Sequence, residues 1–195
     1  MTPLKVAVLC EFTGTVRDAF RRRGHDAVSC DLLPTDAPGP HIQGDCLTHD
    51  WTGYDLIVAH PPCTYLCNSG VRWLTEQPGR MAKMQEAAEF FRRILALPVP
   101  MLAVENPIPH RHAGLPPYTQ TIQPWQFGHG ETKRTCLWLR GLPLLTPTNI
   151  VDGREARVHR ASPGPDRWKL RSATYRGIAE AMAEQWGGVR SEVAA

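Results

Sequence analysis

Short apolar runs alternate along the chain with segments in which apolar residues recur every three or four positions. The compact apolar runs have the length of buried strands, and they lie at 4–10, 26–30, 54–59, 101–104 and 135–139. The segments with the periodicity of amphipathic helices lie at 16–23, 80–97 and 174–186. The pattern therefore predicts strands and helices that alternate along the chain.

The first two predicted helices each carry one apolar face. Val16, Ala19 and Phe20 share a face of the first helix. The apolar positions of the long second helix are Met81, Met84, Ala88, Phe91 and Leu95. We expect both faces, including Met81 and Met84, to pack into the core.

This alternation is typical of βαβ units, so we predict an α/β protein with a mostly parallel sheet. In open sheets of this kind, ligands bind beyond the carboxyl ends of the strands. The segments that follow the predicted strands carry most of the reactive side chains, and they are Glu11–Thr15, Asp31, His60–Cys63 and Glu105–Pro107. We expect these segments to meet at one edge of the sheet and to form a site.

Length and composition indicate which class of protein this is. The 195 residues, 42% hydrophobic and 21% charged, suit a single globular domain over residues 1–195. No apolar run approaches the roughly 18 residues of a membrane span, and the first residues lack the pattern of a signal peptide. The six cysteines are scattered without a Cys-x-x-Cys pair, which favours reduced thiols. We therefore expect a cytoplasmic protein without membrane contact.

Positive charge is concentrated in one segment. The chain carries a net charge of +3, but residues 152–176 contain seven Lys or Arg and three acids, so this segment carries +4 and the rest −1. A basic segment on a nearly neutral body suits a phosphate-bearing partner such as nucleic acid. A solvated surface loop is an equally weighted alternative. The wider region 140–172 is polar and rich in Pro and Gly, and we expect it to be the least regular part of the fold.

One cysteine has the features of a nucleophile. Cys63 follows Pro61 and Pro62, whose locked φ angles fix its position directly after a buried strand. Glu105, at the end of another predicted strand, would bring a carboxyl group beside this thiol. A thiol and a carboxyl in one cleft can attack a substrate and handle its proton.

Other residues of chemical interest have simpler explanations. A metal site built from His60, Cys63, Cys67 and Cys46 would have loose spacing and no second pair of ligands, so we expect no metal. Trp125 and Phe127 could stack on a base, but bulky apolar residues are more often part of the core. The run Arg21–Arg23 ends a predicted helix, where its charge favours the helix dipole.

Several motifs resemble those of DNA cytosine 5-methyltransferases. The segment 61–70, PPCTYLCNSG, resembles the family's Pro-Pro-Cys-Gln-x-Phe-Ser-x-x-Gly motif, and Glu105-Asn106-Pro107 resembles its Glu-Asn-Val motif. Phe12-Thr13-Gly14 resembles the start of the Phe-x-Gly-x-Gly loop, and Lys133-Arg134-Thr135 resembles the Gln-x-Arg-x-Arg motif. The order and spacing agree from residue 6 to about residue 140.

The resemblance implies a Rossmann-like, S-adenosylmethionine-dependent methyltransferase fold with helices on both faces of the sheet, acting on carbon 5 of cytosine in DNA. It implies that Cys63 attacks the base, that Glu105 faces ring nitrogen 3, and that Asn106 holds the loop. The residues implied in cofactor binding are Phe12, Thr13, Gly14, Thr15, Asp31, Leu32, Asp45, Cys46 and Pro61. Those implied in substrate binding are Pro62, Lys133, Arg134, Arg167, Lys169 and Arg171.

The chain also departs from the family. Val16 replaces the second glycine of the cofactor loop, Thr64 replaces the glutamine after the nucleophile, and only the short basic region 141–172 stands where the family has its recognition insert. The chain looks most like small phage and prophage methyltransferases, which implies the cytoplasm of a host cell. The alternative is a non-catalytic or altered-substrate protein that binds nucleic acid or a free pyrimidine nucleotide. An amino-methyltransferase of the Asp-Pro-Pro-Tyr type is disfavoured by His60 and Cys63.

Overall fold

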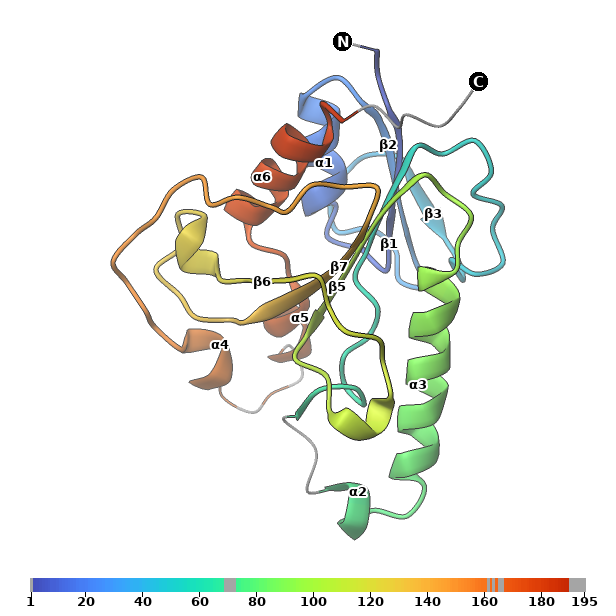
Figure 1. The fold of residues 1–195 in the computed structure, drawn as a ribbon, viewed down its shortest axis with the longest axis vertical. Coiled ribbons are helices and arrows are strands. Elements are labelled where there is room, and N and C mark those ends of the chain that lie inside the picture. Colours follow the sequence, from blue (N-terminus) through green and yellow to red (C-terminus); the bar gives the residue numbers. More distant parts are fainter. Residues whose placement is uncertain (1, 69–72, 161, 163, 165–166, 190–195) are drawn as a thin grey trace.

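The computed structural model describes residues 2–68, 73–160, 162, 164 and 167–189. In this part of the chain the centre is a seven-stranded sheet with the order β3-β2-β1-β4-β5-β7-β6 (Figure 1). The strands are β1 (Lys5–Leu9), β2 (Asp26–Asp31), β3 (His41–Gln43), β4 (Leu56–Ala59), β5 (Met101–Pro107), β6 (Gln120–Ile122) and β7 (Thr135–Arg140). The pairs among β1 to β5 are parallel, whereas β7 is antiparallel to both of its neighbours.

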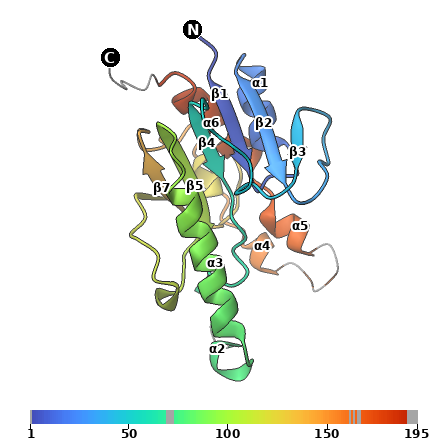
Figure 2. The ribbon, with the colours of Figure 1, turned by 90° about the vertical axis from the view of Figure 1, so that its right-hand side faces the viewer.

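Helices cover both faces of the sheet. They are α1 (Thr15–Arg22), α2 (Trp73–Glu76), α3 (Arg80–Leu95), α4 (Arg157–Arg160), α5 (Arg167–Ser172) and α6 (Arg176–Trp186), with 3-10 turns η2 (Arg111–Ala113) and η3 (Pro124–Gln126). α1 and α6 lie side by side on one face, and α3 covers the other (Figures 1 and 2). No described helix is long and apolar enough to cross a membrane.

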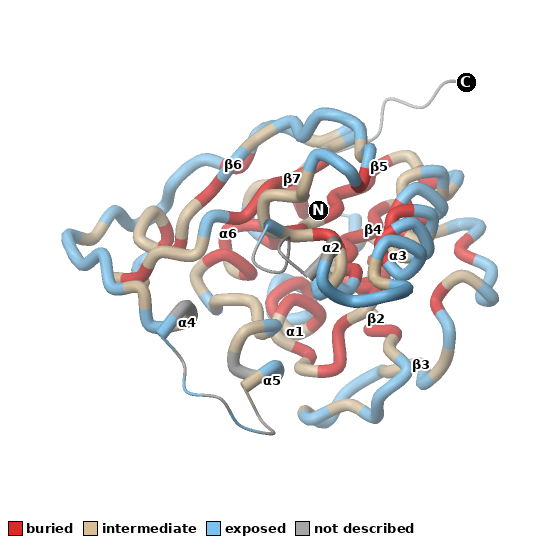
Figure 3. The backbone as a smooth tube through the Cα atoms, turned by 90° about the horizontal axis from the view of Figure 1, so that it is seen from below, coloured by how far each residue is buried: buried red, intermediate tan, exposed pale blue. Residues whose placement is uncertain are grey.

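Alternate residues of the central strands pack into two separate cores. Val6 and Val8 of β1 join the core under α1 and α6, while Ala7 and Leu9 join the core under α3. β4 repeats this alternation along its length. Buried positions therefore run through the sheet and the inner sides of its helices (Figure 3). Because both faces are covered, these strands are apolar throughout, which is what made them visible in the sequence.

The α/β prediction with a mostly parallel sheet is confirmed, and each predicted strand and helix is present. Two short strands, β3 and β6, were not predicted; each has three residues and a single apolar side chain. The region 140–172 is more regular than expected, because α4 and α5 form within it. Glu105–Pro107 also differs from its prediction: the segment does not end the strand but extends it, because all three residues pair with β7.

The apolar face of α3 is shorter than predicted. Met84, Ala88, Phe91 and Ile94 are buried, but Met81 is 38% exposed. α3 begins beyond the carboxyl edge of the sheet (Figure 2), so its first turn has no strand to pack against. The expectation that Met81 is a core residue is therefore wrong.

A buried arginine holds the loop between β2 and β3. The side chain of Arg17 on α1 is fully buried. Its guanidinium donates to the hydroxyls of Ser29 and Thr35 at 3.2 and 3.3 Å and to the carbonyls of Ala37 and Pro38, both at 3.2 Å. The loop is thus wrapped around one side chain rather than packed by a core of its own.

Candidate active site

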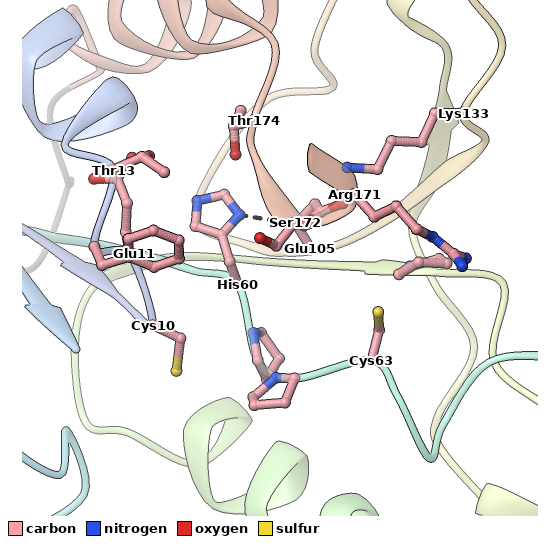
Figure 4. A pocket seen from close by; sticks show the side chains of 14 residues that line it. Cys10, Glu11, Thr13, His60, Cys63, Glu105, Lys133, Arg171, Ser172 and Thr174 are labelled. Atoms are coloured by element: carbon pink, nitrogen blue, oxygen red, sulfur yellow. Dashed lines mark hydrogen bonds and ion pairs between the residues drawn. The ribbon is translucent and has the colours of Figure 1, made fainter. Parts of the chain in front are cut away.

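A cavity opens at the carboxyl ends of β1 and β4, where the strand order of the sheet reverses. Ligands of doubly wound sheets bind at such a reversal. The cavity is lined by residues after β1 and β4, on β5, before β7 and around α5: Cys10, Glu11, Phe12, Thr13, His60, Pro61, Pro62, Cys63, Glu105, Pro107, Lys133, Arg171, Ser172 and Thr174. The predicted strand-end segments after β1, β4 and along β5 therefore do meet (Figure 4).

The loop after β1 is held by its own carboxylate. Glu11 is buried and accepts hydrogen bonds from the amides of Val16 at 2.6 Å and Arg17 at 3.2 Å, in the first turn of α1. Burial raises the pKa of Glu11 above its usual value, although these bonds oppose the rise. Gly14 has a φ of 70°, and a Cβ there would lie 2.4 Å from Arg17 Nη2, so the position requires glycine.

The thiol of Cys63 is held neutral. Its loop is fixed by Asn106, whose Nδ2 donates to the carbonyl of Pro61 at 3.0 Å. A hydrogen bond with Cys67, followed by burial, raises the pKa of Cys63 far above its usual value, and the charge of Lys133 lowers it only in part. Ser69 and Gly70, which complete the predicted motif, lie outside the described residues.

Glu105 is paired with a histidine. Its Oε2 lies 3.2 Å from Nδ1 of His60. Burial alone would raise the pKa of Glu105, but the hydrogen bond from His60, the charge of Lys133 and a hydrogen bond with Thr135 outweigh it, so its pKa lies below the usual value. The carboxyl group is therefore ionised near neutral pH, and it can accept a hydrogen bond without donating one.

The basic region forms one wall of the cavity. Arg171, Ser172 and Thr174 line it from α5 and the turn that follows. The Trp168 ring packs against the Phe12 ring with centroids 5.6 Å apart. The α5 region therefore packs against the loop after β1.

Several charges of the basic segment already have protein partners. Arg157 forms an ion pair with Glu131, and Arg176 lies 3.8 Å from Glu180. The guanidinium of Arg154 lies 3.9 Å from the centre of the Trp125 ring. Arg134 and Lys169 are exposed and Arg167 is half-buried, and none of the three lines the cavity. Asp166, which is counted in the segment's charge, lies outside the described residues.

The cofactor residues implied by the motifs are distributed along the carboxyl edge of the sheet. Phe12, Thr13 and Pro61 line the cavity, whereas the others do not. Asp31 ends β2 and accepts from the Leu33 amide at 2.9 Å. The other implied cofactor residues also lie outside the cavity. Gly14 and Thr15 stand at the start of α1, and Leu32 (71% exposed) and Asp45 are exposed. Cys46 is buried, and its Sγ lies 4.0 Å from Cys10 Sγ.

The site contains residues to which sequence reasoning gave no role. Glu11 and His60 fall within the predicted strand-end segments, but nothing in the sequence indicates that Glu11 caps α1 or that His60 pairs with Glu105. Ser172 and Thr174 carry no signal, because they reach the cavity only through the path of α5. Among the residues that the structure describes, no group of three or more His, Cys, Asp or Glu is arranged to hold a metal ion.

Comparison with known proteins identifies the fold. No family model and no curated protein matches the chain. Among solved structures, one described as a DNA modification methyltransferase encoded within an Escherichia coli prophage matches with a TM-score of 0.50 and 14% identity, over 76% of this chain and 52% of that one. The chain has a Rossmann-like methyltransferase fold.

Other solved structures match less well. The Entamoeba histolytica methyltransferase EhMeth has a TM-score of 0.43 and 11% identity, over 84% of this chain and 61% of that one. An rRNA methylase from Escherichia coli has a TM-score of 0.36 and 17% identity, over 71% of this chain and 57% of that one. The chain thus spans about half to three fifths of the length of these structures.

Proposed function

We propose that the protein is an S-adenosylmethionine-dependent methyltransferase that modifies carbon 5 of cytosine in DNA, with Cys63 as the nucleophile. The observation that carries the proposal is that Cys63 and Glu105 line one cavity together with the loop after β1. A nucleophile and a carboxyl group are the two protein groups that pyrimidine activation needs. The methyltransferase fold supports the same reading.

The carboxyl edge of the sheet offers suitable groups for the cofactor. Phe12 and Thr13 would contact it at the cavity, Asp31 would bind the ribose hydroxyls, and Asp45 would lie near the adenine, with Gly14, Thr15, Leu32, Cys46 and Pro61 around them. The Gly44 amide donates to the Asp31 carbonyl at 2.8 Å, so the turns that carry the two acids are joined. S-adenosylmethionine, when bound, supplies a methyl group on a positively charged sulfur.

The chain's own residues prepare the base. The proton of the Cys63 thiol passes to solvent and its sulfur forms a bond to carbon 6, while ring nitrogen 3 gains a separate proton at the edge that faces Glu105. The ring electrons displaced by this addition make carbon 5 nucleophilic. Asn106 positions the thiol through its hydrogen bond to Pro61. In duplex DNA the base must first leave the stack, at a cost of a few kcal/mol.

The DNA contacts are proposed for the basic residues around the cavity mouth. Arg171 and Lys133 line the cavity itself, beside Pro62, where they would meet the phosphates next to the extruded base. Arg134, Arg167 and Lys169 lie outside it and would contact the backbone further along the strand.

The test is covalent trapping. A DNA duplex with 5-fluorocytosine should form an adduct with the wild-type protein in the presence of S-adenosylmethionine, because fluorine cannot leave carbon 5 as a proton does. Cys63→Ser should form none while it still binds the cofactor in calorimetry, and the matched variant Cys67→Ser should still form an adduct. An adduct that depends on Cys67 and not on Cys63 would overturn the assignment.

A second function is favoured by the position of the cations. Because Arg171 and Lys133 share the cavity with Cys63, a single phosphate could be bound there beside the base, as a free pyrimidine nucleotide would require.

Mass spectrometry of cells that express the protein separates the two functions. 5-Methylcytosine in DNA alone, without the methylated nucleotide in the soluble pool, supports the DNA substrate. A non-catalytic protein would produce neither, and it need not bind S-adenosylmethionine.

A further inference from the structure

His60 lies in the cavity between two carboxylates. It follows β4 directly, its side chain is only 8% exposed, and Figure 4 shows it between Glu11 and Glu105. Its Nδ1 faces Glu105, but its Nε2 is buried and, among the described residues, has no hydrogen-bond partner. The contact of Nδ1 with Glu105 is therefore the hydrogen bond that orients the imidazole.

The pairing creates a chemical requirement. Glu105 is ionised, as its hydrogen bonds and the charge of Lys133 dictate, so it has no proton to give. Ring nitrogen 3 must gain a proton when sulfur adds to carbon 6. The side chain whose ring nitrogen lies against this carboxylate, at 3.2 Å, is the imidazole of His60, a group that can donate a proton in general acid catalysis.

We propose that His60 supplies the proton that Glu105 delivers to the base. The inference rests on the proposed function. The imidazolium gives its Nδ1 proton to the Glu105 carboxylate, and the neutral carboxyl group passes it to ring nitrogen 3 as the sulfur–carbon 6 bond forms. His60 is then a neutral imidazole. When the carbon 5 hydrogen leaves to solvent as a proton and the thiolate departs, nitrogen 3 returns its proton by the same path. His60 acts through Glu105 and is therefore a positioning residue.

Several charged and titratable groups share the cavity with His60, so a pH profile of the wild type alone would not identify it. They are Glu11 after β1, Glu105 on β5, Lys133 before β7, Arg171 on α5, and the thiols of Cys10 and Cys63. The informative measurement compares variants, and it uses a step that needs the proton but no methyl donor.

That step is hydrogen exchange at carbon 5. In deuterium-containing water without S-adenosylmethionine, reversible addition of Cys63 exchanges the carbon 5 hydrogen of cytosine in DNA. His60→Gln should exchange about 100-fold more slowly near neutral pH, the scale of general acid catalysis. Its residual rate should rise steadily toward acid pH, because Glu105 must then take its proton from water. The wild-type rate should depend less steeply on pH, because His60 and not water then supplies the proton. His49→Gln, at an exposed position outside the cavity, is the matched control.

Trapping with 5-azacytosine separates a proton role from a structural one. Nitrogen at position 5 makes that ring electrophilic enough to accept the thiol without a proton at nitrogen 3. His60→Gln should therefore trap this DNA as fast as the wild type does. Equal exchange rates and pH profiles in the two proteins would overturn the inference, and so would a variant that loses trapping and exchange together. A wild type that traps nothing would instead overturn the proposed function, on which the inference depends.

Discussion

At the level of single residues, the state of Cys63 is set by a second sulfur. Cys67 follows it by one helical turn, and their hydrogen bond is the largest cause of the raised pKa of Cys63. A thiolate is the reactive form, so the resting protein holds its proposed nucleophile inactive. The raised pKa therefore disfavours the thiolate form of Cys63.

Removal of the second sulfur should make Cys63 reactive. Cys67→Ala removes the hydrogen bond that raises the pKa of Cys63. The pKa of Cys63 should then fall toward its usual value, and more thiolate should be present at a given pH. For each unit by which the pKa of Cys63 falls, the fraction of thiolate at a pH below that pKa rises about tenfold. Iodoacetamide labelling of the peptide that contains Cys63, followed by mass spectrometry at pH 7 to 9, should show faster alkylation than in the wild type. An unchanged rate would mean that burial, and not Cys67, holds the thiol neutral.

At the level of elements, the loop between β2 and β3 depends on one side chain of α1. Arg17 fills the centre of the loop and leaves no apolar core there. Gly39 lies so close that a Cβ at that position would be 2.7 Å from the guanidinium carbon. The position of the turn that follows β2, where Asp31 is proposed to bind the cofactor, therefore depends on Arg17.

Arg17→Leu should cost about 3–5 kcal/mol of unfolding free energy, because it removes the hydrogen bonds of a fully buried guanidinium to Ser29 and the loop carbonyls and its ion pair with Asp18. Arg22→Ala, in the same helix, is the matched control: this arginine is 48% exposed on its side chain and pairs with Glu180 at 2.6 Å. Exposed ion pairs contribute about 1 kcal/mol or less. Urea denaturation followed by fluorescence measures both, and equal losses in the two variants would contradict the role assigned to Arg17.

At the scale of the whole molecule, charge is distributed less simply than the sequence implies. The segment 152–176 carries more positive charge than the entire chain, yet Arg157 and Arg176 are engaged by Glu131 and Glu180. Arg171 faces the cavity. Arg167 and Lys169 lie on α5 outside the cavity, next to Arg171 in the chain, and they are two of the residues proposed to contact the DNA backbone.

The double variant Arg167→Ala/Lys169→Ala should weaken DNA binding without regard to sequence. With about 0.9 unit of slope for each phosphate contact, the plot of log affinity against log salt should become shallower by about 1.8. Binding of S-adenosylmethionine should be unaltered. A slope equal to that of the wild type would show that these side chains do not contact the backbone, and the free nucleotide would then be the better-supported substrate.

The sequence predicted those parts of the molecule that repeat a local pattern. β1 and β4 are apolar on both faces, and α1 has a regular apolar stripe, so each was visible from neighbouring residues alone. β3 and β6 are too short to leave a pattern, and they exist because a neighbouring strand supplies their hydrogen bonds.

The same limit applies to the candidate site. The sequence placed Cys63 and Glu105 after two predicted strands; Glu105 in fact lies within β5, but the parallel pairing of β4 with β5 still brings both residues to the same cavity. The partnership of His60 with Glu105 and the packing of Trp168 on Phe12 join residues far apart in the chain. Such pairs depend on the path of the chain in space, which neither composition nor periodicity encodes locally.

The wall formed by Arg171, Ser172 and Thr174 has a consequence for synthesis of the protein on the ribosome. Every side chain proposed to act on the base has been made once translation reaches Asn106. The cavity nevertheless stays open on one side until Thr174 has emerged and α5 has folded back onto the first loop. Translation thus separates the appearance of the thiol from the completion of its pocket, and a nascent chain has no enclosed place in which to modify a base.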